Sequence, residues 1–242
     1  VAVSSAGDMN GDGFDDLLIG SSSANPYQQY SGASFVFYGK ASGFSSSFDL
    51  GSINSNSTDG ARFIGVSAND QSGQAVANAG DINGDGFDDI FIGASRADPN
   101  GTSSGAGYVV FGRASGLEPR FFLSSLDGSN GFRLNGVAFE NYAGYSVSSA
   151  GDINGDGIDD MAIGARGADP VLFNEGAAYV VFGKVSGWTS SLQLSALDGT
   201  NGFRIAGRTD SEAVGSSVNG AGDVNGDGYD DLLVGASQAG AG

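Results

Sequence analysis

Four near-identical stretches of the chain place aspartate and asparagine at alternate positions. They read GDMNGDGFDD from Gly7, GDINGDGFDD from Gly80, GDINGDGIDD from Gly151 and GDVNGDGYDD from Gly222. Counted from its first aspartate, each stretch has Asp, Asn, Asp and Asp at positions 1, 3, 5 and 9, with glycine at position 6. Alternating oxygen ligands around a glycine turn can enclose a hard cation, and six to eight oxygens at roughly 2.3 to 2.6 Å suit Ca²⁺. The spacing therefore predicts four calcium-binding loops.

We expect each loop to bind one Ca²⁺, about four in all, through three carboxylates, one amide oxygen and the position-7 carbonyl, with water completing the shell. Mg²⁺ suits the loops less, because it prefers a tight octahedron and keeps its waters. The position-8 aspartates are expected in solvent or behind the ligands; they are Asp15, Asp88, Asp159 and Asp230. The predicted ligands are Asp8, Asn10, Asp12, Phe14, Asp16, Asp81, Asn83, Asp85, Phe87, Asp89, Asp152, Asn154, Asp156, Ile158, Asp160, Asp223, Asn225, Asp227, Tyr229 and Asp231.

Two other interpretations of these loops are less favourable. An EF-hand loop begins in the same way but needs a glutamate at position 12 and flanking helices. Here position 12 is aliphatic, as Ile19, Ile92, Ile163 and Val234. A bare Asn-Gly or Asp-Gly hairpin turn does not need so many aspartates, whose mutual repulsion would cost stability. The pattern favours a strand-loop-strand calcium site in which the position-9 aspartate closes the loop and starts the second strand.

Composition narrows the function further. The net charge is −18, and 16 of the 28 acidic residues lie inside the four aspartate stretches. This charge argues against nucleic acid or an anionic membrane as a partner. The chain has no His and no Cys, which excludes imidazole or thiolate zinc sites, Cys nucleophiles and a Ser-His-Asp triad. We therefore expect a protein that is not an enzyme.

The aspartate stretches belong to a repeat that spans the chain, with steps of 73, 71 and 71 residues. Each repeat carries short runs rich in Val, Ile, Phe and Tyr between Gly, Asn, Asp and Ser, which predicts about four strands and no helix. A four-stranded sheet must pack against neighbours, and radial packing of such sheets is a β-propeller. Small residues in the first strand and bulky ones in the third favour a propeller over a β-sandwich. The predicted repeats of this single domain, 1–242, are 1–73, 74–144, 145–215 and an incomplete 216–242.

The stretch SVSSAGDINGDGIDDMAIGA, Ser146 to Ala165, and its copies resemble the FG-GAP repeat of integrin alpha-subunit propellers and of many bacterial surface proteins. The resemblance covers nearly the whole chain. It implies an all-β propeller of four-stranded antiparallel blades, with the calcium loop joining the first two strands of each blade. The chain supplies three full blades and half of a fourth. We expect an incomplete propeller, either an excerpt of a longer protein or a chain completed by another copy.

The resemblance implies an extracellular or cell-surface protein, and we expect it to be bacterial. We favour an adhesion or structural module that binds a protein or polysaccharide through the loops opposite the calcium loops. A carbohydrate-binding lectin is the alternative, and a propeller accompanying a secreted enzyme is less favoured. No apolar run approaches the roughly 18 residues of a membrane-spanning helix, so membrane insertion is not expected. Aromatic residues in the opposite loops could contact a ligand or pack between blades; they are Tyr27, Tyr30, Phe139, Tyr142 and Phe173.

Overall fold

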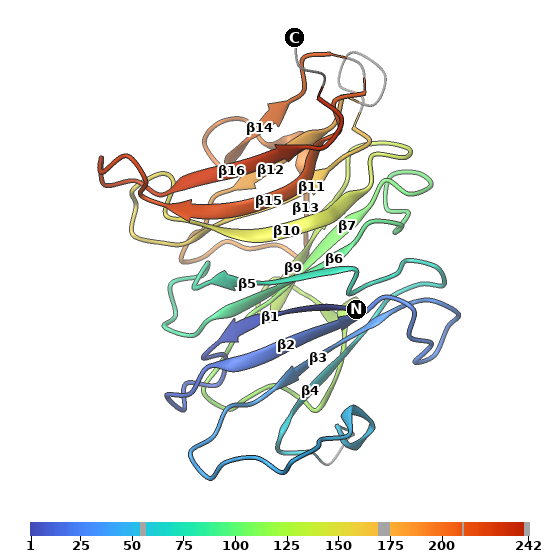
Figure 1. Cartoon of the computed structure of the whole chain (residues 1–242), viewed down its shortest axis with the longest axis vertical. Coiled ribbons are helices and arrows are strands. Elements are labelled where there is room, and N and C mark those ends of the chain that lie inside the picture. Colours follow the sequence, from blue (N-terminus) through green and yellow to red (C-terminus); the bar gives the residue numbers. More distant parts are fainter. Residues whose placement is uncertain (54–56, 169–174, 210, 240–242) are drawn as a thin grey trace.

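The computed structural model describes residues 1–53, 57–168, 175–209 and 211–239. These residues form an all-β protein of four sheets, which lie one above another in chain order from blue to red in Figure 1. No described helix is long and apolar enough to cross a membrane. The helical segments are three short 3-10 turns, η1 (Leu50–Ser52), η2 (Leu123–Ser125) and η3 (Leu194–Ala196).

The first and second sheets each have five strands, in the orders β1-β2-β3-β4-β8 and β5-β6-β7-β9-β13. The first sheet consists of β1 (Ala2–Gly7), β2 (Asp16–Ser21), β3 (Ala33–Phe37), β4 (Gly60–Ile64) and β8 (Arg120–Phe122). The second consists of β5 (Ala75–Gly80), β6 (Asp89–Ala94), β7 (Ala106–Val110), β9 (Gly131–Asn135) and β13 (Ser191–Gln193). In each, the first four strands are antiparallel, as the sequence predicts.

The third sheet has four antiparallel strands in chain order, and the fourth has two. The third sheet consists of β10 (Ala143–Gly151), β11 (Asp160–Ala165), β12 (Ala177–Val181) and β14 (Gly202–Ala206). The fourth consists of β15 (Val214–Gly222) and β16 (Asp231–Ala236). These four sheets are the predicted propeller blades.

The fifth strand of the first two blades was not predicted. β8 and β13 come from the following repeat and pair in parallel with the outer strands β4 and β9. The backbone amide of Arg62 donates to the carbonyl of Pro119 at 2.9 Å, and that of Arg133 donates to the carbonyl of Ser190 at 3.0 Å. An open sheet edge presents unpaired amides and carbonyls. The second and third repeats therefore cover the outer edge of the blade before them.

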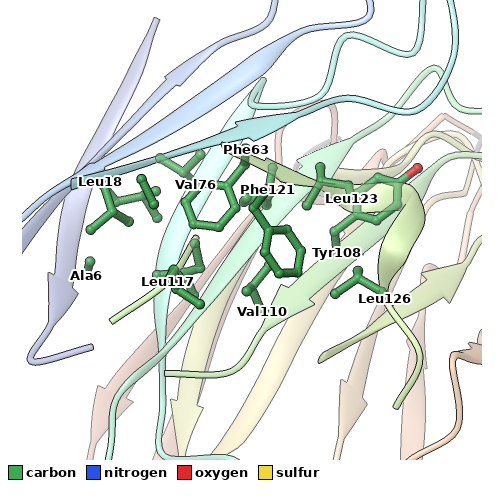
Figure 2. Packing of buried hydrophobic residues seen from close by; sticks show 14 of the residues in the cluster. Ala6, Leu18, Phe63, Val76, Tyr108, Val110, Leu117, Phe121, Leu123 and Leu126 are labelled. Carbon is green, nitrogen blue, oxygen red and sulfur yellow. The ribbon is translucent and has the colours of Figure 1, made fainter. Parts of the chain in front are cut away.

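Apolar side chains fill the space between successive blades. In Figure 2, Phe63 of the first blade lies beside Val76 of the second blade and beside Phe121 of β8. Near the axis, β1 contacts β5, β5 contacts β10 and β10 contacts β15. A Cβ added to Gly20 in β2 would lie 2.2 Å from the carbonyl oxygen of Gly73, which precedes β5 of the next blade. The backbones of neighbouring blades therefore approach too closely at this point of β2 for a larger residue.

Candidate metal centres

Each aspartate stretch forms the loop between the first and second strands of its blade. The position-9 residues Asp16, Asp89 and Asp160 are the first residues of β2, β6 and β11, and Asp231 begins β16. The aliphatic position-12 residues lie inside these same strands. The predicted strand-loop-strand geometry is therefore present, with no helix on either side of the loop.

Within the third loop, side-chain oxygens turn inward onto the loop's own amides. Asp152 Oδ1 and Asn154 Oδ1 both accept from the backbone amide of Asp156, at 3.0 and 2.9 Å. Asp152 Oδ2 accepts from the amide of Gly157 at 2.8 Å. Asp156 Oδ1 accepts from the amide of Ile158 at 3.0 Å. These bonds recur in the other three loops.

The position-9 carboxylate ties the loop to the rest of its blade. In the third blade, Asp160 Oδ2 accepts from the amide of Ile153 at 3.0 Å, and Oδ1 accepts from the amide of Gly183, after β12, at 2.8 Å. Asp16 and Asp89 make the equivalent bonds to their own blades. Asp89 and Asp160 are fully buried. The face that carries the aspartate loops therefore also carries the end of the third strand.

Burial makes the negative charge of these carboxylates costly. It raises the pKa of Asp16 and of Asp160 to about 6, and the pKa of Asp89 well above its ordinary value. For Asp160, the backbone amides of Gly183 and Ile153, which donate to the carboxylate, lower the pKa, and the nearby carboxylate of Asp156 raises it. Both the desolvation and the repulsion would be relieved by a cation in the loop.

The donor set of each loop fits a hard cation, but its carboxylates are not gathered into one shell. Among the residues that the structure describes, no three Asp or Glu side chains lie close enough together to hold a metal ion. The side-chain oxygens of the predicted ligands instead accept hydrogen bonds from backbone amides of the same turn. In the third loop, Asp152 and Asn154 both accept from the amide nitrogen of Asp156. Carboxylate, amide and carbonyl oxygens are the ligand types that Ca²⁺ takes. Calcium binding stays a prediction that this chemistry supports.

The position-8 aspartates have a contact that the sequence analysis missed. Asp88 Oδ2 accepts from the backbone amide of Asp8, 80 residues away and in the preceding blade, at 2.8 Å. Asp159 and Asp230 accept in the same way from Asp81 and Asp152, at 2.9 and 2.8 Å. These three carboxylates are thus neither free in solvent nor confined to their own loop, because each binds the loop of its neighbour.

Comparison with known proteins agrees with the repeat and the fold. The model of the FG-GAP repeat matches residues 1–37, 72–110, 143–181 and 214–242. The matched segments contain every aspartate loop. The chain belongs to the FG-GAP repeat family.

The relatives of this FG-GAP chain include integrin alpha subunits. It is 34% identical to integrin alpha-4 of Xenopus laevis over 69% of the chain and 14% of that protein. It is 30% identical to integrin alpha-V of Gallus gallus over 95% of the chain and 19% of that protein. The chain therefore spans less than a fifth of these relatives. Both are animal proteins, so they give no support to the expected bacterial origin.

The FG-GAP blades present matching loops on the face opposite the aspartate loops. In the connection from the fourth strand to the next blade, Asn69, Glu140 and Ser211 share a positive φ of 66°, 53° and 65°. Two residues later, φ is again positive, at 54° or 55°, in Gln71, Tyr142 and Ala213. A positive φ is unfavourable for residues other than glycine, and it is kept only where contacts with the surrounding structure hold the backbone in place. One backbone conformation thus carries different side chains in each repeat.

The aromatic residues predicted for these loops have different roles. The Tyr27 ring lies 5.6 Å from that of Phe122, and its hydroxyl accepts from Arg120 Nη1 at 3.0 Å, so it packs against the fifth strand. Tyr142 lies beside Arg166, whose guanidinium carbon is 5.9 Å from its ring centroid. Tyr30 and Phe139 are 42% and 60% exposed and stay available for a ligand. Phe173 lies outside the described residues.

One loop residue gives a pH-dependent prediction. Asp70 is 5% exposed, and Oδ2 accepts from the amide of Ser67 at 2.9 Å. Burial, with a contribution from Asp98, raises its pKa to about 6, against opposing effects of Ser67 and Arg133. Between the ordinary pKa of 3.8 and this raised pKa, the folded state keeps a proton on Asp70 that the unfolded state has released. The folded state is therefore most stable, with respect to this group, below pH 3.8, and it loses this stabilisation as pH rises through about 6.

At the equivalent position of the next repeat, Asn141 Oδ1 accepts from the amide of Ala138 at 3.0 Å. Asp70→Asn should thus fit the same loop. We expect it to increase the free energy of unfolding at pH 7 by about 1 to 2 kcal/mol and to match wild type near pH 4.5. Urea unfolding at both pH values measures this. A variant that is destabilised equally at both would contradict the buried-charge interpretation.

Proposed function

We propose that the chain is an extracellular, calcium-stabilised adhesion or structural module without enzymatic activity. The observation that carries the proposal is the fourfold aspartate loop, with its ligand-type oxygens arranged around one turn in every blade. Membership of the FG-GAP family and the similarity to integrin alpha subunits support an adhesion role.

In each loop, the ion would be held by the side chains at positions 1, 3, 5 and 9 and by the carbonyl at position 7. Bound Ca²⁺ supplies concentrated positive charge. Four ions would change the formal charge of the chain from −18 to −18 + 8 = −10. The loop oxygens would then fix the turn that aligns the first two strands. Binding on the order of 10⁻⁴ to 10⁻³ M suits an extracellular module.

The partner would be a protein or a polysaccharide bound to the loops opposite the calcium loops. These loops keep one backbone conformation while their residues differ, which is how a rigid scaffold presents recognition residues. A hollow of about 220 Å³ on this face is lined by Tyr142, Arg166, Gly167, Ser211, Ala213 and Gln238. Binding to a glycan array without binding to protein ligands would favour the lectin alternative.

Asp156→Ala tests the proposed calcium role in a single blade. The variant removes one carboxylate and the acceptor of the Ile158 amide. We expect calorimetric titration with CaCl₂ to give three sites in place of four, with a melting temperature in calcium about 3 to 6 °C lower, the effect of losing roughly 1.5 kcal/mol. The matched control is Glu118→Ala, which removes an exposed acid outside the loops. Equal site numbers and melting temperatures in the two variants would contradict the assignment.

A further inference from the structure

The backbone of each of the first three aspartate loops is held by the blade that follows it. The amides of Asp8, Asp81 and Asp152, each the first predicted ligand of its loop, donate to position-8 carboxylates of the next blade at 2.8, 2.9 and 2.8 Å. The same three aspartates use both side-chain oxygens to cap amides of their own loops. One residue therefore joins the interior of a loop to the neighbouring blade.

The residue that precedes each first ligand leaves room for this contact. A Cβ added to Gly7 would lie 2.1 Å from Asp88 Oδ2, and one added to Gly80 would lie 2.2 Å from Asp159 Oδ2. The third interface repeats the arrangement, with Asp230 Oδ2 at 2.1 Å from a Cβ on Gly151. The carboxylate thus packs directly on the loop backbone at all three interfaces between blades.

Two further kinds of contact join an aspartate loop to the blade that follows it. The position-2 carbonyls of Met9 and Ile82 accept from the amides of Arg113 and Lys184 in the following blade, at 2.8 and 3.0 Å. The Met9 and Ile82 side chains are themselves fully buried between blades. In addition, the position-7 ring of Phe87 lies against Gly11 of the preceding loop, where an added Cβ would approach it to 2.4 Å.

The position-8 aspartate is adjacent in sequence to the position-9 aspartate, which caps its own loop and begins the second strand. The neighbouring position-9 residue thus fixes the backbone from which the position-8 carboxylate reaches the preceding loop. We propose that Asp88, Asp159 and Asp230 are positioning residues, each of which holds the preceding loop in the conformation that binds Ca²⁺. This inference rests on the proposed calcium binding.

Amide NMR spectra of the whole chain can follow each loop separately. The amides of Gly86 and Gly157 donate to the first aspartate of the second and third loops, both at 2.8 Å, and so report on those loops. With Asp159→Ala, we expect the CaCl₂ midpoint of Gly86 to rise about tenfold, the loss of one hydrogen bond to a charged group. The midpoint of Gly157, in the mutated blade, should change less than about twofold. In chelator, the Asp81 amide should exchange its hydrogen faster than in wild type.

Two control variants separate the hydrogen bond from the loss of charge. Asp159→Asn removes the charge but keeps an acceptor oxygen, so the Gly86 midpoint should stay near wild type. Asp15→Ala removes an exposed position-8 carboxylate to which no amide of the described residues donates. It should leave the Gly86 and Gly157 midpoints unchanged.

The outcomes distinguish this proposal from the proposed function. If wild-type reporters respond to calcium but Asp159→Ala shifts Gly86 no more than Gly157, the positioning role is wrong and calcium binding stands. Equal shifts of Gly86 in Asp159→Ala and Asp159→Asn would also overturn the positioning role, since the loss of charge alone would explain them. If no glycine reporter responds to calcium, both proposals fail. Unchanged exchange of the Asp81 amide in chelator would refute the hydrogen bond itself.

Discussion

Removing calcium with a chelator is expected to lower the melting temperature of the protein by about 12 to 24 °C. With a dissociation constant of roughly 0.2 mM and about 2 mM Ca²⁺, each independent site contributes about 1.4 kcal/mol, so four sites contribute about 6 kcal/mol. For a chain of this size, each kcal/mol corresponds to about 2 to 4 °C. Differential scanning calorimetry at fixed protein concentration, with calcium and with excess chelator, measures the change.

Magnesium at the same ionic strength is the control for this experiment. General screening of the −18 charge would act with either cation, whereas the flexible oxygen loops should discriminate in favour of Ca²⁺. We therefore expect Mg²⁺ to restore only a small part of the melting temperature. Identical melting curves with calcium and after thorough chelation would refute the structural role of the ion.

Gly80→Ala is expected to cause a large loss of stability, because it disrupts both the loop backbone and the contact with the next blade. Gly80 has a φ of +75°, and an added Cβ would lie 2.2 Å from Asp159 Oδ2. The left-handed conformation costs alanine about 1 to 2 kcal/mol, and displacing Asp159 breaks its bond to the Asp81 amide, worth about 1.5 to 3 kcal/mol. We expect a total of about 3 to 4 kcal/mol in denaturant unfolding in chelator, where calcium affinity does not contribute.

Gly86→Ala is the matched control within the same loop. Its φ is also positive, at +90°, but nothing lies within 4 Å of an added Cβ. This variant should therefore lose only the conformational part, about 1 to 2 kcal/mol. Equal losses for Gly80→Ala and Gly86→Ala would show that the packing of Asp159 on the second loop contributes nothing to stability.

The strand pattern and the loop positions could be predicted from sequence because both depend on local chemistry. The glycine turn and the start of the second strand at Asp16, Asp89 and Asp160 follow from residues close together in the chain. The opposite loops were harder to interpret. Tyr27 resembles a ligand-binding residue by exposure and composition, yet it packs on Phe122 from the following repeat. Nothing near Tyr27 in sequence indicates that neighbour.

The sequence by itself determined the repeat, the all-β blades and the candidate ligands, because each is encoded in short local stretches that recur in every repeat. Only the tertiary structure decided what crosses between blades. β8 and β13 add to the preceding sheets, and Asp88, Asp159 and Asp230 bind amides 78 to 80 residues away. The physical reason is that sheet edges and loop amides take whichever partners the radial stacking brings within reach, and those partners leave no local pattern in the sequence.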